Sequence, residues 1–209
     1  MSPPAATDWD RYYERPARLA GLSRRVTAAA LLRQLRRWAP PRPVLAELGG
    51  ANSCFFDRIQ AELRPRQYHV VDSNQVGLDR LRQRSGARAD VFLHHDDVLQ
   101  LTLPTPMDLV FSVGLIEHFD PVGTQRAVRA HFDLLKPGGI AVITFPTPTW
   151  LYRAARCAVE RSGAWRFPDE RPLRLAEVLA VAAPYGQPLF QTLLWPIVFT
   201  QYLVVWRKV

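Results

Sequence analysis

The sequence predicts an α/β protein whose core is a mostly parallel sheet of seven strands with helices on both faces. Short apolar runs alternate with segments of helical spacing from residue 44 onward, and several of these runs end in an acidic residue. The last two apolar runs are joined by a link too short for a crossover helix. Alternating strands and helices form parallel sheets covered on both sides, whereas a closing hairpin makes the last strand antiparallel.

The expected elements follow in chain order. Residues 1–16 are polar and rich in proline, and residues 17–39 repeat apolar side chains at helical spacing until three prolines end the helix. We expect an N-terminal lid and basic helix over residues 1–43 and one compact domain over residues 44–209. The expected strands are 44–48, 68–71, 91–94, 109–113, 140–145, 189–194 and 201–206. The expected helices of the domain are 54–63, 75–84, 124–135, 149–161 and 173–183.

Composition narrows the class of protein. The chain has 209 residues, a net charge of +8 and 48% hydrophobic residues, which suffices for a full core. The charge makes an anionic partner plausible, but the arginines are scattered and no nucleic-acid-binding motif is present. Two cysteines, of which we expect Cys54 to be a small core residue, indicate a reducing compartment. Neither a signal peptide nor an apolar run of about 18 residues is visible, which favours a soluble cytoplasmic protein.

The stretch from Glu47 to Ser53 joins a strand, a tight glycine turn and a helix. Gly49 and Gly50 permit positive φ and close approach of a ligand to the main chain. The pattern lacks the last two glycines of the dinucleotide-binding fingerprint. Glu47 would repel a pyrophosphate and suits a ligand with a positive end.

Acidic and polar residues stand at the carboxyl ends of the predicted strands, where open α/β sheets bind ligands. Asp72 and Ser73 follow the second strand, and Asp96-Asp97-Val98 follows the third. The fourth strand continues through Ser112-Val113-Gly114 into Glu117-His118. One acid after a strand is common as a helix cap, but acids after three successive strands favour a binding site.

In this order, the motifs resemble those of the S-adenosylmethionine-dependent methyltransferases with the seven-stranded Rossmann-like (class I) fold. The resemblance covers residues 44–145. It rests on the loop Glu47-x-Gly49-Gly50-Ala51, on Asp72, on Asp97-Val98, on the fourth-strand segment 108–119 and on the turn 135–139. Ala51 departs from the family, because it stands where a second glycine is usual, and its methyl group is expected to crowd the cofactor.

The resemblance implies S-adenosyl-L-methionine as cofactor and a role for each matching residue. Asp72, followed by Ser73, would bind the ribose hydroxyls, and Gly49, Gly50 and Ala51 would lie against the methionine portion and ribose. Glu47 would add negative potential near the cationic cofactor. Asp97 would bind the adenine amino group, with Asp96 as the competing assignment. Val98 would pack on the ring, and Ser112 and Gly114 would line the cofactor through backbone groups.

A hydroxyl acceptor must lose a proton during methyl transfer. His118, next to Glu117 at the end of the fourth strand, is the candidate base, because histidine titrates near neutral pH. The alternative is a histidine that packs over the cofactor or holds the following loop. His131 is expected to be a packed or surface residue. Without a further cluster of His or Cys, the sequence predicts no metal site.

The acceptor is expected to be a small molecule or a lipid- or sugar-linked group, with nucleic acid disfavoured. Substrate-facing candidates are aromatic and charged residues of the lid and of the stretch 147–174. In the lid they are Trp9, Tyr12 and Tyr13. In the stretch 147–174 they are Trp150, Tyr152, Arg153, Trp165, Phe167, Asp169, Glu170 and Arg171. The same stretch suits an ordinary helix packed on the sheet or contact with an anionic membrane surface.

Two other functions compete with methyl transfer. A nicotinamide-dependent oxidoreductase is disfavoured by the incomplete glycine fingerprint and by the absence of a Tyr-x-x-x-Lys pair. A non-catalytic module that binds a membrane surface through the basic helices, and retains the cofactor fold, is the alternative from another class. The sequence leaves the oligomeric state open.

Overall fold

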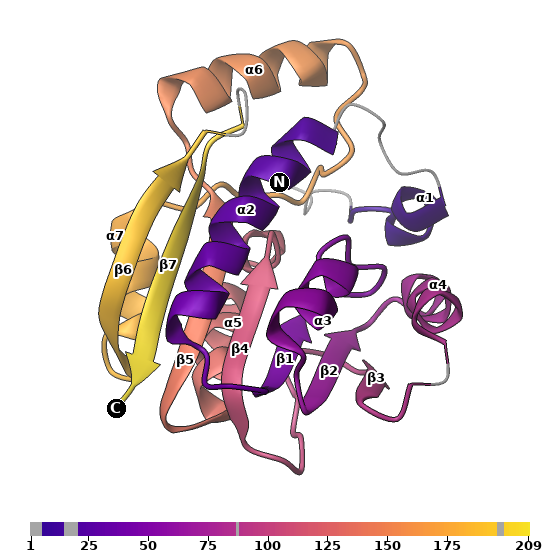
Figure 1. Cartoon of the computed structure of the whole chain (residues 1–209). Coiled ribbons are helices and arrows are strands. Elements are labelled where there is room, and N and C mark those ends of the chain that lie inside the picture. The colour runs from indigo at the N-terminus through magenta and orange to yellow at the C-terminus, as the bar shows by residue number, and fades with distance from the viewer. Residues whose placement is uncertain (1–5, 15–20, 87, 196–198) are drawn as a thin grey trace.

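The described strands form one sheet with the order β3-β2-β1-β4-β5-β7-β6 (Figure 1). The computed structural model describes residues 6–14, 21–86, 88–195 and 199–209. The strands are β1 (Val44–Leu48), β2 (Gln67–Asp72), β3 (Val91–His95), β4 (Met107–Val113), β5 (Leu135–Pro146), β6 (Gly186–Leu194) and β7 (Gln201–Lys208).

The pairing confirms the predicted topology. β1 is parallel to both β2 and β4, and the sheet extends in parallel to β3 on one side and β5 on the other. β7 is antiparallel to β5 and to β6, as expected of a closing hairpin. The carboxyl ends of β1, β2 and β4 therefore lie along the same edge of the sheet, beneath α1 and α6 (Figure 1).

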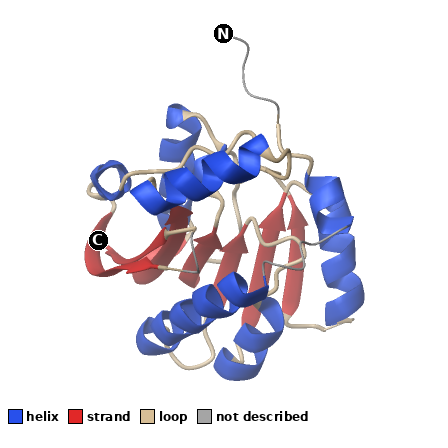
Figure 2. Ribbon diagram, turned by 90° about the horizontal axis from the view of Figure 1, so that it is seen from above, coloured by secondary structure: helices blue, strands red, loops and turns tan. Residues whose placement is uncertain are grey.

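Helices cover both faces of the sheet (Figure 2). One core cluster joins the sheet to α2, α3 and α4, and the other joins it to α5 and α7. The helices are α1 (Trp9–Glu14), α2 (Gly21–Trp38), α3 (Phe56–Leu63), α4 (Gln75–Ser85), α5 (Pro121–Asp133), α6 (Trp150–Arg161) and α7 (Leu175–Ala182), with a 3-10 turn η2 (Ile116–His118).

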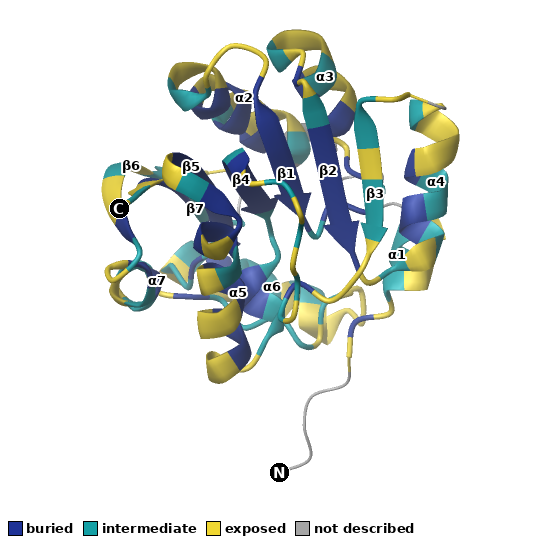
Figure 3. Ribbon diagram, turned by 90° about the horizontal axis from the view of Figure 1, so that it is seen from below, coloured by how far each residue is buried: buried dark blue, intermediate teal, exposed yellow. Residues whose placement is uncertain are grey.

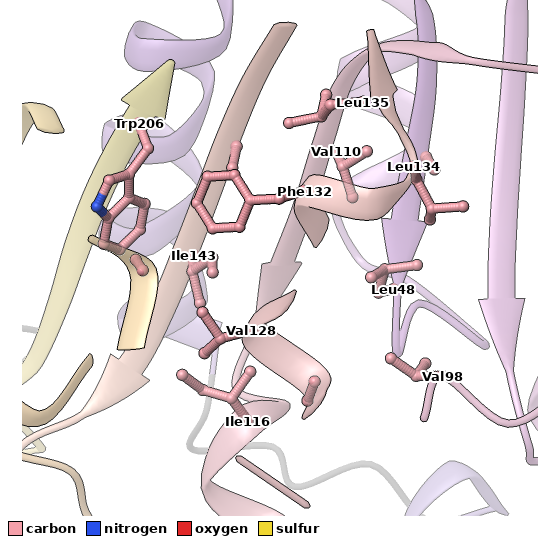
Figure 4. Close-up of a cluster of buried hydrophobic side chains, with 14 of the residues drawn as sticks. Leu48, Val98, Val110, Ile116, Val128, Phe132, Leu134, Leu135, Ile143 and Trp206 are labelled. Atoms are coloured by element: carbon pink, nitrogen blue, oxygen red, sulfur yellow. The ribbon is translucent and has the colours of Figure 1, made fainter. Parts of the chain in front are cut away.

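The two clusters arise from the alternation of side chains along each strand. In β1, Ala46 and Leu48 face the cluster shown in Figure 4, whereas Leu45 faces the opposite one. Phe132 of α5 packs against Trp206 of β7, with ring centroids 6.2 Å apart. Central strands are buried along most of their length, and the exposed residues concentrate on the outer faces of the helices (Figure 3).

Several predicted boundaries were wrong, and local chemistry explains the start of α5. α5 begins at Pro121 rather than residue 124, because the Asp120 side chain accepts a hydrogen bond from the N–H of Gly123 and proline suits the first helical position. β5 begins at Leu135, which pairs with Met107 across an irregularity in β4. The sequence did not predict α1 or η2. Residues 17–20 of the predicted N-terminal helix lie outside the described residues.

Two further predictions concern a membrane-spanning helix and the position of Cys54. None of the helices in the described part of the chain combines the length and the hydropathy that a bilayer crossing requires. Cys54 is exposed, so the prediction that it belongs to the core was wrong. Its helix starts two residues later than predicted, at Phe56, which is buried in its place.

Candidate active site

A cavity of about 530 Å³ opens at the carboxyl ends of β1, β2 and β4, under the N-terminal segment. Residues of the loops after β1, β2, β3 and β4 line one part of it, and residues of α1 and of the segment before α7 line the other. Of the residues predicted for the site, the following line the cavity: Tyr12, Tyr13, Glu47, Gly49, Gly50, Asp72, Ser73, Asp97, Val98, Gly114, Glu117 and His118.

The glycine turn brings the main chain close to its neighbours. Gly49 has φ +72°, and a Cβ built on it would lie 2.9 Å from Leu115. A Cβ on Gly50 would lie 2.5 Å from Cγ of Glu47. These two positions therefore require glycine, the first for backbone conformation and both for space.

Glu47 is a buried acid held by two hydroxyl groups. Ser53 Oγ donates to one carboxylate oxygen and Tyr68 Oη to the other, each at 2.6 Å. Burial raises the pKa of Glu47 to about 7 although both hydrogen bonds lower it. With both oxygens engaged, Glu47 influences the cavity by its charge and by bracing the turn.

Asp72 closes the turn from the next strand. Its carboxylate accepts hydrogen bonds from the backbone N–H of Ala51 at 3.0 Å and of Asn74 at 2.8 Å. Burial raises the pKa of Asp72, and these N–H groups partly offset that effect. Tyr13 of α1 faces the same carboxylate, and burial together with Asp72 raises the pKa of the Tyr13 hydroxyl.

Ala51 does not line the cavity. It is fully buried, and its Cβ lies 2.5 Å from where a Cβ on Gly77 of α4 would stand. The methyl group that departs from the family pattern thus points toward α4 and occupies space that Gly77 leaves free. The expectation that it crowds the ligand site has no support in this geometry.

After β3, Asp97 and Val98 line the cavity, and Asp96 is not among the described lining residues. Asp97 also accepts a hydrogen bond from the N–H of Leu99 at 2.9 Å. After β4, Val113 and Gly114 line the cavity instead of Ser112. Ser112 is buried behind the strand, where its Oγ lies 2.9 Å from Nε2 of His131.

His118 forms a pair with an acid far away in the sequence. Its Nδ1 lies 3.0 Å from Oδ1 of Asp169. The Thr7 hydroxyl donates to the same oxygen, and the Thr7 backbone N–H donates to Oδ2. Burial lowers the pKa of His118, and Asp169 partly offsets this. Burial raises the pKa of Asp169, but the hydrogen bonds from Thr7 and His118 outweigh it, so that this acid stays ionised. Nε2 of His118 has no hydrogen-bond partner among the described residues. It is therefore free to accept a proton, as a general base must be.

Two more acids stand beside this pair. Glu117 is buried, and burial together with nearby Glu170 raises its pKa well above the usual range. Tyr152 Oη donates to Glu170, and Arg156 lies 3.5 Å from the same carboxylate oxygen. The nearest ligand atoms of Glu117, His118 and Glu170 all lie within 4.8 Å of one another. These three residues could hold a metal ion. The sequence did not predict this cluster, because Glu170 lies far from Glu117 and His118 along the chain.

Of the residues predicted to face the substrate, those on α6 lie elsewhere. Trp150 is 77% exposed, and Arg153 lines a separate shallow hollow with Arg174 and Tyr202. Tyr152 is buried and holds Glu170 rather than lining the cavity. Two other predicted aromatic candidates, Trp9 and Phe167, do line the cavity, and their rings lie 4.9 and 5.8 Å from the ring of His118.

Comparisons with known proteins agree with this arrangement. Residues 46–139 match the family described as a methyltransferase domain. A comparison of the sequence with curated proteins gives no match.

Solved structures share the fold at low sequence identity. The N-methyltransferase NodS of Bradyrhizobium japonicum, in complex with S-adenosyl-L-homocysteine, has TM-score 0.67 at 18% identity, over 95% of this chain and 90% of that chain. Magnesium protoporphyrin IX methyltransferase of Synechocystis, also with bound SAH, has TM-score 0.76 at 10% identity, over 96% and 93%. The 1,6-didemethyltoxoflavin-N1-methyltransferase of Burkholderia thailandensis has TM-score 0.72 at 17% identity, over 100% and 92%.

The matched segment contains the end of β1, all of β2, β3 and β4, and the loops after these strands, which line one part of the cavity. The sheet order agrees with the resemblance noted in the sequence. Residues 46–139 of this chain therefore match the methyltransferase-domain family, and the chain has the seven-stranded, Rossmann-like fold of these solved methyltransferases.

Proposed function

We propose that this chain transfers the methyl group of S-adenosyl-L-methionine to a hydroxyl oxygen of a small-molecule, sugar- or lipid-linked acceptor. The observation that carries the proposal is the pair formed by His118 and Asp169 inside the cavity, 3.0 Å apart. Asp169 fixes the imidazole with the proton on Nδ1, which leaves Nε2 free to take a proton from the acceptor.

The part of the cavity near β1, β2 and β3 suits the cofactor. Glu47, Asp72 and Asp97 line it, and these acids favour a ligand with a positive charge and hydroxyl or amino donors. Asp72 would hold the ribose, Asp97 and Val98 the adenine, and Gly49 and Gly50 the methionine portion. The cofactor supplies the methyl group on a cationic sulfonium.

The acceptor oxygen forms its bond to the methyl carbon while the carbon–sulfur bond breaks and the electron pair stays on sulfur. Nε2 of His118 takes the hydroxyl proton, and the Asp169 carboxylate stabilises the imidazolium that forms. Trp9 and Phe167 exclude water from this part of the cavity and hold the carbon skeleton of the acceptor.

Calorimetry and thermal shift with S-adenosylmethionine, S-adenosylhomocysteine and NAD test the cofactor. We expect binding of the first two and none of NAD, followed by transfer of a labelled methyl group in a screen of hydroxyl-bearing acceptors. Stabilisation by NAD alone would contradict the proposal. Binding of anionic vesicles without cofactor, together with no methyl transfer, would support the non-catalytic membrane-binding module instead.

A further inference from the structure

The cavity is acidic although the chain as a whole carries a net charge of +8. Among its described lining residues are six carboxyl side chains and two arginines. Both arginines are engaged near the cofactor side: Arg24 donates to Tyr12 Oη, and Arg84 binds Asn52 and the Ser53 carbonyl. The acids around His118 therefore face no basic side chain that lines the cavity.

Glu117 has one carboxyl oxygen without a hydrogen-bond partner. It is 2% exposed, and its Oε2 accepts no hydrogen bond from any residue that the structure describes. Asp169 is occupied by His118 and Thr7, and Glu170 by Tyr152 and Arg156. A buried carboxyl oxygen without a donor is costly, so the site lacks a hydrogen-bond donor that a ligand can provide.

We propose that the acceptor is a vicinal amino alcohol, whose ammonium group binds between Glu117 and Glu170 while its hydroxyl group faces Nε2 of His118. This inference rests on the proposed function and specifies its substrate class.

The spacing supports two heteroatoms on adjacent carbons. The nearest ligand atoms of Glu117, His118 and Glu170 lie within 4.8 Å of one another. A nitrogen in hydrogen-bond contact with both carboxylates, and an oxygen in contact with His118, must then be close neighbours. Neighbouring carbons of one molecule place an ammonium and a hydroxyl group in this way.

The charges decide which of the two groups receives the methyl group. Burial raises the pKa of both Glu117 and Glu170, and an ammonium group bound between them favours their ionised form. The amine in turn keeps its proton there, so it has no lone pair for attack on a methyl carbon. His118 stays neutral because burial lowers its pKa, so it is ready to accept the hydroxyl proton. The rings of Trp9 and Phe167 near His118 add attraction for a cation.

The test uses the full chain saturated with S-adenosylhomocysteine and three matched probes. These are 2-amino-1-phenylethanol, the corresponding diol 1-phenyl-1,2-ethanediol, and 2-phenylethylamine, which lacks the hydroxyl group. We expect the amino alcohol to bind at least tenfold more tightly than the diol in calorimetry. We also expect labelled methyl transfer from S-adenosylmethionine to the amino alcohol to give the O-methyl product.

Variants separate the carboxyl contact from general effects. Glu117→Gln and Glu170→Gln should each weaken binding of the amino alcohol at least tenfold and leave binding of the diol within twofold. Glu62→Gln, on the outer side of α3, should change neither. Thermal unfolding of each variant shows whether it is folded, and the second glutamine variant serves if the first does not fold.

Equal affinity for amino alcohol and diol, binding of none of the probes, or methylation on nitrogen would overturn the inference. So would activity that EDTA abolishes and Mg²⁺ restores, because the three-residue cluster would then hold a metal ion. Failure to bind S-adenosylhomocysteine would refute the proposed function itself, and the calorimetric titration with that ligand reveals this before any probe is added.

Discussion

Asp72 at the end of β2 accepts a hydrogen bond of 3.0 Å from the backbone N–H of Ala51, in the loop after β1. The same carboxylate accepts from Asn74, at the start of α4. One side chain therefore fixes two loops of the cofactor side before any ligand binds. We therefore expect Asp72 to affect binding of S-adenosylmethionine by more than direct contact with the ribose.

Asp72→Ala should weaken binding of S-adenosylhomocysteine at least tenfold in calorimetry. Each charge-assisted hydrogen bond to a ribose hydroxyl is worth about 1.5–3 kcal/mol, and the variant also frees the N–H groups of Ala51 and Asn74. Asp79→Ala, on the exposed side of α4, is the control and should keep the parent affinity. An unchanged affinity in Asp72→Ala would exclude the ribose role.

Asp169→Asn should reduce kcat about 100-fold and leave the KM for S-adenosylmethionine within twofold, because the asparagine no longer stabilises the imidazolium. The Asp169 carboxylate raises the pKa of His118, so NMR titration should show a lower pKa in the variant. Thr7→Val is the matched control. It removes a different hydrogen bond to Asp169 and should retain both kcat and the titration of His118. An equal loss of kcat in Asp169→Asn and Thr7→Val would mean that Asp169 acts only by holding the N-terminal segment.

Activity should rise with pH as His118 loses its proton and should reach a plateau near neutral pH. Burial lowers the pKa of this histidine below 6.5, so the neutral, proton-accepting form prevails above that value. A pH profile of kcat over pH 5–8 measures the effect. A rate that falls over this range would show that a protonated group, not a base, is required.

Gly77→Ala should destabilise the protein by about 1–3 kcal/mol, because the new Cβ would lie 2.5 Å from Ala51 and 2.9 Å from the ring of Tyr13. The double variant Ala51→Gly with Gly77→Ala should recover part of that loss. Urea unfolding of the parent, both single variants and the double variant gives the coupling energy. If the changes in unfolding free energy of the two single variants add up to that of the double variant, the side chains at positions 51 and 77 do not compete for space.

Glu47 should make stability decrease as pH rises from about 4.5 to about 7. Its pKa is about 7 in the folded chain and 4.5 as its ordinary value, so the folded state holds more protons over this interval. The loss is about 3 kcal/mol at most. Glu47→Gln should become more stable relative to the parent across this range, as measured by urea unfolding, whereas Glu62→Gln should not. If the unfolding free energies of Glu47→Gln and the parent changed with pH in parallel, the raised pKa of Glu47 would be excluded.

The alternation of apolar runs and helical segments sufficed to predict the sheet, because each strand carries its own pattern of burial. The residues of the strand-end loops, such as Asp72 and Val98, were also predictable, since topology alone brings these ends together. Contacts between distant segments were not. Nothing near His118 in the sequence points to Asp169, and α6 resembles a pocket wall in composition although Trp150 and Arg153 lie outside the cavity. The prediction that Ser112 lines the cavity was wrong, because its neighbours Val113 and Gly114 line it instead.

The N-terminal segment contacts both halves of the cavity. Asp10 binds Asn74 and Tyr13 faces Asp72 on the cofactor side, while Thr7 binds Asp169 and Trp9 packs on His118 on the acceptor side. One short segment, Thr7 to Tyr13, thus touches both parts of the cavity. We expect that it must move before either product leaves, so that its rate of opening would set an upper limit on turnover.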